Sequence, residues 1–116
     1  MDIEKVRELC LQLKGTTESF PFDKTTLVFK VMNKMYCLEN LDNKSINLKA
    51  EPEKVIELIE AYSAILPGYH MNKKHWITIK LEELSDDKLL KELINNSYLL
   101  IISKLNKKQK TELDTL

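Results

Sequence analysis

The sequence predicts an α+β two-layer sandwich, an antiparallel sheet with helices on one face, in the order helix, three strands, helix, strand, helix. Two observations lead to this fold class. Hydrophobic residues recur at helical spacing near both ends of the chain and again in its middle. Between the first two of these segments lie three short runs with strand-like alternation, joined by turns of two or three residues. Such short turns make the strands antiparallel, because parallel neighbours need crossovers of roughly a dozen residues or more.

The first helix is expected over residues 3–13, where apolar side chains share one face. Asp2 stands at its start and Gly15 just past its end, as is typical of helix boundaries. The next segment, residues 15–24, has no regular pattern but contains Phe20-Pro21-Phe22. We interpret these two aromatic side chains as anchors that hold the connection against the core; contact with a ligand is the alternative.

Three strands are expected next, over residues 25–32, 35–41 and 45–49, because β-branched and aromatic residues alternate there with others. Asn33-Lys34 joins the first two strands as a tight hairpin, and Asp42-Asn43-Lys44 joins the second to the third. These strands form a meander. With the helices on one face of the sheet, the other face is expected to be partly open.

A second helix is expected over residues 51–64, with a proline near its first turn, where the missing N–H costs little. Alternation over residues 76–81 predicts a fourth, half-buried strand. The last helix is expected over residues 85–104, which carry a long apolar stripe. The remaining residues, 106–116, are polar and are expected to fray.

Residues 1–116 are expected to form a single domain, because this length suffices for one core and not for two. Eighteen basic residues balance eighteen acidic ones, so net charge argues neither for nor against nucleic acid. No signal-like or membrane-spanning apolar run is present, and we expect a cytoplasmic protein without membrane contact. Cys10 and Cys37 show no metal-ligand or redox spacing and are expected to be reduced and buried.

Residues 66–76 have the most unusual composition in the chain. Both histidines, the only tryptophan, a Pro-Gly turn and two adjacent lysines fall within these eleven residues. His70 and His75 are five apart, whereas helical metal ligands are three or four apart, and no nearby Cys, Asp or Glu completes a set. The segment also lacks a nucleophile with a base and an orienting group, and the chain has no glycine-rich phosphate loop. We therefore expect a binding surface rather than an enzyme, with no metal and no cofactor.

The same residues are suited to nucleic acid. Lys73 and Lys74 would neutralise phosphates, Asn72 and the histidines would supply hydrogen bonds, and Tyr69 and Trp76 would offer stacking planes. A plainer interpretation is a solvated loop whose tryptophan packs into the core while the lysines keep the loop soluble. The composition of the loop leaves both interpretations open.

Several short motifs point to a known family. They are Phe20-Pro21-Phe22, Leu27-Val28-Phe29-Lys30-Val31, Lys34-Met35-Tyr36, Asn47-Leu48-Lys49, Pro67-Gly68-Tyr69-His70-Met71-Asn72-Lys73-Lys74-His75-Trp76, Ser97-Tyr98 and Lys104-Leu105. In these motifs the chain resembles the MmcQ/YjbR family of small bacterial proteins, and the resemblance extends over nearly its whole length. It implies a fold similar to the frataxin-like (CyaY-like) and secretion-chaperone-like two-layer domains.

The resemblance also implies DNA binding of a double-wing type. The contact residues that it implies in this sequence are His70, Asn72, Lys73, Lys74, His75 and Trp76, with Lys30 and Lys49 as neighbours on the sheet face. The likeness to frataxin does not imply iron handling, because function has to be argued from the site.

Two other function classes stay open. A small-molecule-binding protein, or an unrecognised enzyme, would carry this loop at the rim of a pocket. A protein-interaction module would use the open sheet face, either as a homodimer or by docking on a larger protein. The sequence identifies neither the ligand nor the oligomeric state.

Overall fold

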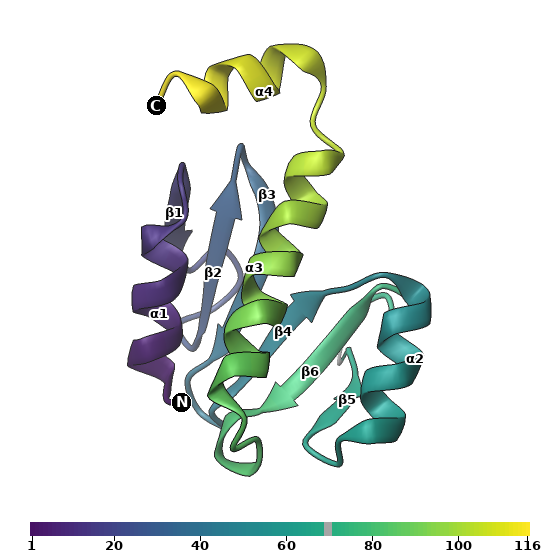
Figure 1. Cartoon of the computed structure of the whole chain (residues 1–116). Coiled ribbons are helices and arrows are strands. Elements are labelled where there is room, and N and C mark those ends of the chain that lie inside the picture. The colour runs from purple at the N-terminus through teal and green to yellow at the C-terminus, as the bar shows by residue number, and fades with distance from the viewer. Residues whose placement is uncertain (69–70) are drawn as a thin grey trace.

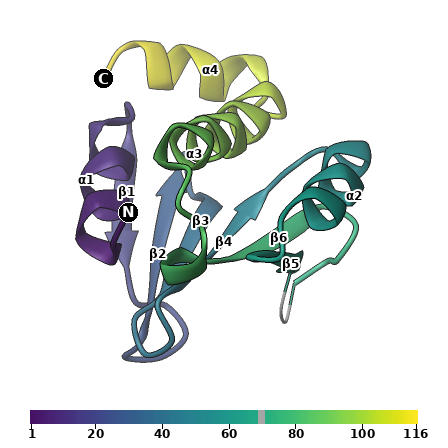
Figure 2. The same ribbon diagram turned by 60° about the horizontal axis from the view of Figure 1, so that its bottom comes forward.

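The computed structural model describes residues 1–68 and 71–116. It contains one six-stranded antiparallel sheet, in the strand order β1-β2-β3-β4-β6-β5, with helices packed on one face (Figure 1 and Figure 2). The predicted α+β fold class is therefore confirmed. The elements in chain order are α1 (Ile3–Gln12), β1 (Thr16–Ser19), β2 (Thr26–Val31), β3 (Lys34–Asn40), β4 (Ser45–Lys49), α2 (Pro52–Ala61), β5 (Ile65–Pro67), β6 (Trp76–Lys80), the 3-10 turn η1 (Leu81–Glu83), α3 (Asp87–Ser103) and α4 (Lys107–Asp114).

The first helix begins and ends where the sequence predicts. The Asp2 side chain accepts a hydrogen bond from the backbone amide of Lys5 at 2.8 Å, which satisfies a donor that the first turn leaves unpaired. Val6 and Cys10 form its buried face. Beyond its end Gly15 has a φ of +75°, in the left-handed region that glycine adopts without steric cost.

The three predicted central strands, β2, β3 and β4, form the expected meander. The β2–β3 turn falls on Met32 and Asn33, one residue earlier than predicted, and both have positive φ angles, of 47° and 67°. The register between β2 and β3 shifts near the start of β3, as in a β-bulge. Tyr36 and Cys37, although adjacent, both belong to the core between the sheet and the helices.

A buried serine joins α3 to the sheet. The Ser97 hydroxyl donates to the carbonyl oxygen of Tyr36 at 2.5 Å and accepts from the backbone N–H of Lys49 at 2.9 Å. Ser97 is fully buried, and Lys49 is the last residue of β4. The hydroxyl therefore satisfies backbone groups at two places where the sheet is irregular or ends.

Replacing Ser97 by alanine is expected to lower the free energy of unfolding by about 1–3 kcal/mol, because both hydrogen bonds are lost at a buried site. Urea unfolding followed by tryptophan fluorescence measures the change. Ser103→Ala is the matched control, since the Ser103 hydroxyl is exposed and donates to the Leu100 carbonyl within the same helix. Equal losses in the two variants would contradict the role given to Ser97.

Four elements were not predicted: β1, β5, α4 and the 3-10 turn η1. The two strands are short, and each pairs with a single neighbour at an edge of the sheet. The expectation that the C-terminal tail frays is wrong, because Asn106 and Gln109 form a capping box that starts α4. Leu113 of α4 is buried, and a Cβ atom added at Gly15 would lie 2.6 Å from it, so α4 packs back over the end of α1 (Figure 1).

Buried hydrophobic residues form two clusters, one on each side of the sheet. The larger cluster lies between the sheet and the helices and includes Cys10 and Cys37, both free and buried as predicted. The smaller cluster, on the opposite face, consists of Val28, Leu38 and Trp76. In the described part of the chain no helix is long and apolar enough to cross a membrane.

Candidate nucleic-acid interface on the open sheet face

The loop before β6 presents two lysines to solvent because Asn72 folds the backbone behind them. The Asn72 side-chain oxygen accepts a hydrogen bond from the backbone amide of Lys74 at 3.0 Å. The backbone carbonyl oxygen of Asn72 accepts hydrogen bonds from the amides of His75 and Trp76 at 3.1 and 3.0 Å. Lys73 and Lys74 are exposed, and His75 is half-buried. Asn72 is thus engaged in shaping the turn, and the lysines are the outward groups.

Trp76 is buried, with 9% of its surface exposed, and it packs on Val28 and Leu38 with Met35 and Met71 against the same cluster. Its carbonyl oxygen accepts from the Gly68 amide at 2.9 Å, so the two ends of the loop meet there. The structure therefore places the tryptophan as a support beneath the open face. The plainer interpretation of the loop holds for this side chain.

Strand register places Lys30 and Lys49 on the open face, away from the helices. Phe29 belongs to the core beneath the helices, and successive strand residues alternate between faces, so Lys30 points to the other side. Lys49 lies directly opposite Trp76 in the β4–β6 pair, and cross-strand partners share a face. Both lysines are half-buried. Lys49 thus lies beside Trp76, at the end of the loop that carries Lys73 and Lys74.

The open-face positions of the described strands carry lysines and no carboxylate. The lysines are Lys30, Lys49 and Lys80. The two strand glutamates face the helices instead: Glu18 is held by the Arg7 guanidinium of α1 at 2.8 and 2.9 Å, and Glu39 lies between Leu27 and Ile46 in the register. The two faces of the sheet therefore differ in charge.

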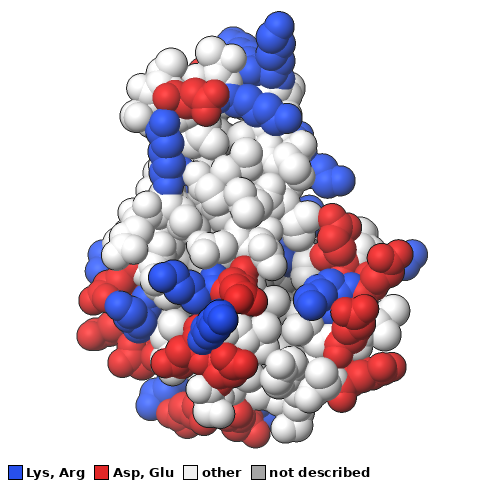
Figure 3. Space-filling model, viewed as in Figure 1, with Lys and Arg blue, Asp and Glu red and all other residues white. Residues whose placement is uncertain are grey.

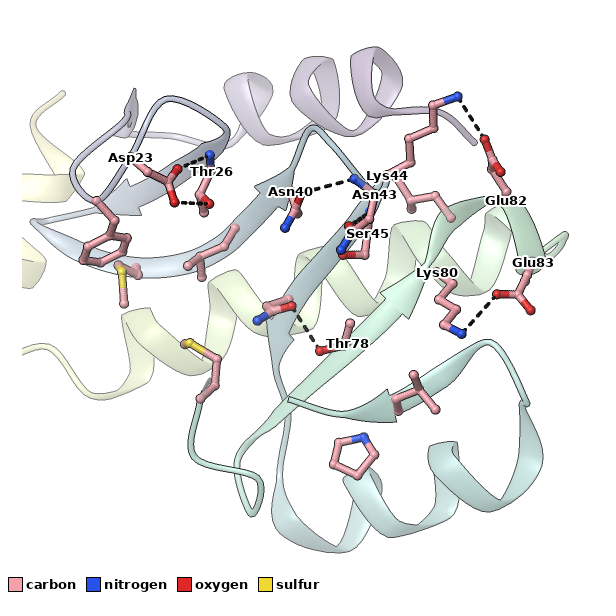
Figure 4. Close-up of a pocket in the computed structure, with 18 residues that line it drawn as sticks. Asp23, Thr26, Asn40, Asn43, Lys44, Ser45, Thr78, Lys80, Glu82 and Glu83 are labelled. Atoms are coloured by element: carbon pink, nitrogen blue, oxygen red, sulfur yellow. Dashed lines mark hydrogen bonds and ion pairs between the residues drawn. The ribbon is translucent and has the colours of Figure 1, made fainter. Parts of the chain in front are cut away.

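A groove of about 1180 Å³ crosses the open face (Figure 4). The side chains that form it include Phe22, Met35, Leu38, Asn40, Asn47, Leu66, Met71, Thr78 and Lys80. In the strand order, the loop after β1 that carries Phe22 lies toward one edge of the sheet, and β5, which carries Leu66, forms the other edge. The groove thus spans the sheet, with Phe22 toward one side and Leu66 on the other.

Polar side chains on the floor of the groove are held by hydrogen bonds. The Thr78 hydroxyl donates to the Asn47 side-chain oxygen at 3.1 Å (Figure 4). The Asn40 side-chain oxygen accepts from the amides of Asp42 and Asn43 at 3.0 and 3.2 Å. These hydrogen bonds fix the orientation of the side-chain amides of Asn40 and Asn47 on the floor of the groove.

Carboxylates at the rim of the groove are already engaged. Glu82 pairs with Lys44 at 3.0 Å and Glu83 with Lys80 at 3.6 Å. Asp23 accepts hydrogen bonds from the amides of Thr25 and Thr26, and these bonds hold its pKa below the ordinary value. The acidic rim lies at the ends of β2 and β6 remote from Lys30 and the Lys73–Lys74 loop.

The prediction that Phe20 and Phe22 pack on the core is wrong. They were expected to anchor the connection on the core, but 49% and 64% of their surfaces are exposed. Phe22 lines the groove and Phe20 does not. The alternative interpretation, contact with a ligand, therefore gains support for Phe22.

A second set of basic residues lies elsewhere, around the start of α4. Its members are Lys104, Lys107, Lys108 and Lys110, all exposed. Figure 3 shows the helix-covered face of the molecule, where acidic and basic residues intermingle and blue side chains gather at the top, near α4. This set provides a comparison for the lysines of the open face.

The structure places Lys30, Lys49 and Trp76 on the open face, and Asn72, Lys73 and Lys74 in the loop that leads into Trp76. His75 is half-buried within the same loop, and His70 lies outside the described residues. Sequence reasoning missed the groove and placed ligand contact by Phe22 second to packing on the core. Among the described residues, no group of three His, Cys, Asp or Glu side chains is arranged to hold a metal ion.

Comparison with known proteins identifies the family. A model of the YjbR family matches residues 11–100. The chain belongs to the YjbR family. The resemblance found in the sequence motifs is thereby confirmed.

Relatives and solved structures align over most of the chain. The uncharacterized Escherichia coli O157:H7 protein YbdF is 38% identical over 107 residues, which cover 90% of this chain and 88% of YbdF. The uncharacterized protein YjbR of Escherichia coli K12 is 27% identical over 100 residues, or 84% and 85% of the two chains. The crystal structure of Deinococcus radiodurans DR2400, with a DUF419 domain, has a TM-score of 0.90 at 41% identity and covers 97% of this chain and 88% of its own. A Pseudomonas syringae crystal structure has a TM-score of 0.75 at 28% identity and covers 86% and 98%.

Proposed function

We propose that this YjbR-family protein binds nucleic acid through the open face of its sheet. The family resemblance implies that the nucleic acid is DNA. Lys30, Lys49, Lys73 and Lys74 would contact the phosphates. The observation that carries the proposal is the segregation of charge, with lysines and no carboxylate at the open-face positions of the described strands. The proposal is for a cytoplasmic binding protein rather than an enzyme.

These four ammonium groups are available to an anion. Within residues 1–68 and 71–116, none of them takes part in an ion pair, whereas Lys44 and Lys80 at the other end of the groove do. A phosphate that binds a lysine releases condensed counterions, which is the main source of affinity in such complexes. Because the whole chain has a net charge of zero, we expect this local surface to dominate the attraction.

Salt dependence tests the proposal. If four lysines contact phosphates, the logarithm of the association constant should fall with the logarithm of salt concentration with a slope of about −3 to −4. Fluorescence anisotropy of a labelled oligonucleotide, titrated at about 50 and about 200 mM salt, measures this slope. Absence of binding at the lower salt concentration, or an affinity that does not change with salt, would show that phosphate contact is wrong.

A further inference from the structure

We propose that the groove on the open face holds unpaired bases, so that the nucleic acid this surface selects is single-stranded. This inference rests on the proposed function and adds the class of nucleic acid to it. Lysines at the end of the face near Trp76 would follow the phosphates, and the floor and rims of the groove would contact the bases.

The shape of the surface favours a single strand. The bases of a duplex are read in its major groove by an element that projects from the protein, such as a helix or a two-stranded β-ribbon. Here the polar side chains Asn40, Asn47 and Thr78 lie on the floor of a recess, where the bases of a duplex do not reach. Bases of a single strand are splayed outward and enter such a recess. The volume of about 1180 Å³ is above the range of about 300–1,000 Å³ that accepts drug-sized ligands, so more than one base has room.

The rims supply apolar and aromatic surface for the faces of the bases. Phe22 lines the groove with 64% of its surface exposed, so its ring is accessible to a base. Met35 and Met71 lie along the same groove and pack on Trp76 and its neighbours. Thioethers make favourable contacts with aromatic rings, and base stacking on a phenylalanine tolerates any sequence.

The floor supplies hydrogen bonds to base edges. Since the Asn40 side-chain oxygen is occupied by two backbone amides, its NH₂ group is the end left to a ligand. Figure 4 shows this nitrogen on the side of the side chain away from the Asn43 turn. Amide donors match the carbonyl and ring-nitrogen acceptors that unpaired bases expose.

The distribution of charge predicts along which end of the open face the phosphate backbone of the nucleic acid lies. Among the residues that line the groove, the carboxylates are Asp23, Glu82 and Glu83, all at one end of it. The two glutamates are neutralised by lysines. Lys49 and Lys73, which form no ion pair within residues 1–68 and 71–116, lie at the opposite end of the strands. The phosphate backbone is therefore expected along that end, with bases directed into the groove.

Three oligonucleotides of equal length test the inference by fluorescence anisotropy: an oligo-dT strand, an abasic strand with the same phosphates, and a duplex. We expect oligo-dT to bind about tenfold or more tightly than the other two, because only it offers free bases. A parallel oligo-U strand separates RNA from DNA, and preference for either supports the inference. Quenching of Trp76 fluorescence by oligo-dT is a second readout, since the tryptophan lies beneath the groove.

Phe22→Ala is expected to weaken oligo-dT binding about 5- to 100-fold and to leave duplex and abasic binding within about twofold. Phe20→Ala is the matched control, because it removes the same side chain from an exposed position outside the groove. Equal affinity for all three oligonucleotides, or equal effects of the two variants, would overturn this inference and leave the phosphate proposal intact. No binding to any oligonucleotide would overturn both. Self-association that Phe22→Ala abolishes would assign the groove to a second copy of the chain and overturn the inference.

Discussion

Replacing Lys30, Lys49, Lys73 and Lys74 together by glutamine is expected to lower affinity for an oligonucleotide by about 100-fold or more at low salt. Each lysine that contacts a phosphate contributes about one unit to the salt slope. The variant should therefore also bind with little dependence on salt. Anisotropy titrations at several salt concentrations measure both quantities.

The lysines around α4 provide the control. Changing Lys104, Lys107, Lys108 and Lys110 to glutamine removes the same four charges from an exposed region away from the open face. If net charge alone governed binding, the two variants would lose affinity equally. We expect the α4 variant to keep an affinity within about threefold of the wild type and a nearly unchanged slope. A larger loss in the α4 variant would place the interface there instead.

The second large effect concerns the buried carboxyl group of Glu39. This residue lies in β3 on the helix side of the sheet with none of its surface exposed. Among the described residues, neither of its oxygens has a hydrogen-bond partner. Burial raises the pKa of Glu39 to about 8; the nearby Arg7 charge lowers this pKa, and Glu18 raises it. The carboxyl group is therefore protonated in the folded protein at neutral pH.

Stability is expected to fall as pH rises from about 4.5 to about 8. In this window the unfolded chain loses the Glu39 proton and the folded protein keeps it, so rising pH favours unfolding. Above about pH 8 both states are ionised and this contribution becomes constant. The full effect between pH 5 and neutrality is on the order of 2–3 kcal/mol.

Glu39→Gln removes this titration and retains nearly the same shape. We expect the variant to match the wild type near pH 5 and to exceed its free energy of unfolding by on the order of 2–3 kcal/mol near pH 7. Urea unfolding at several pH values measures the difference, with Glu57→Gln on the exposed side of α2 as the control. Parallel pH profiles for the wild type and Glu39→Gln would contradict the buried, neutral carboxyl group.

Much of the fold could be predicted because its strongest elements carry local signals. The apolar stripe of α1 and the alternation in β2 identify them without tertiary information. β1 and β5 are different, because Thr16–Ser19 and Ile65–Pro67 are too short for a periodic signal and depend on one neighbouring strand each. For α4 a local signal was present, the Asn106–Gln109 capping box, but its lysine-rich sequence and single buried Leu113 resembled a disordered tail.

The site could be predicted only in part, because it depends on pairings between distant strands. The Lys73–Lys74 turn is local, and its exposure follows from sequence. That Lys49 lies opposite Trp76 depends on the β4–β6 register, which no nearby residue specifies. Phe22 was assigned to the core because two aromatic residues that flank a proline usually anchor a connection. Its exposure depends instead on the path of the loop after β1, which the sequence does not specify.

Chemical-shift mapping tests most directly whether the open sheet face binds nucleic acid. In ¹H–¹⁵N spectra of the protein titrated with an oligonucleotide, we expect the largest changes at Lys30, Lys49, Lys73 and Lys74 and at the Trp76 indole N–H. Amides of α2 and α4 should change little. Changes confined to α4, or spectra that do not change at low salt, would contradict the assignment of this face.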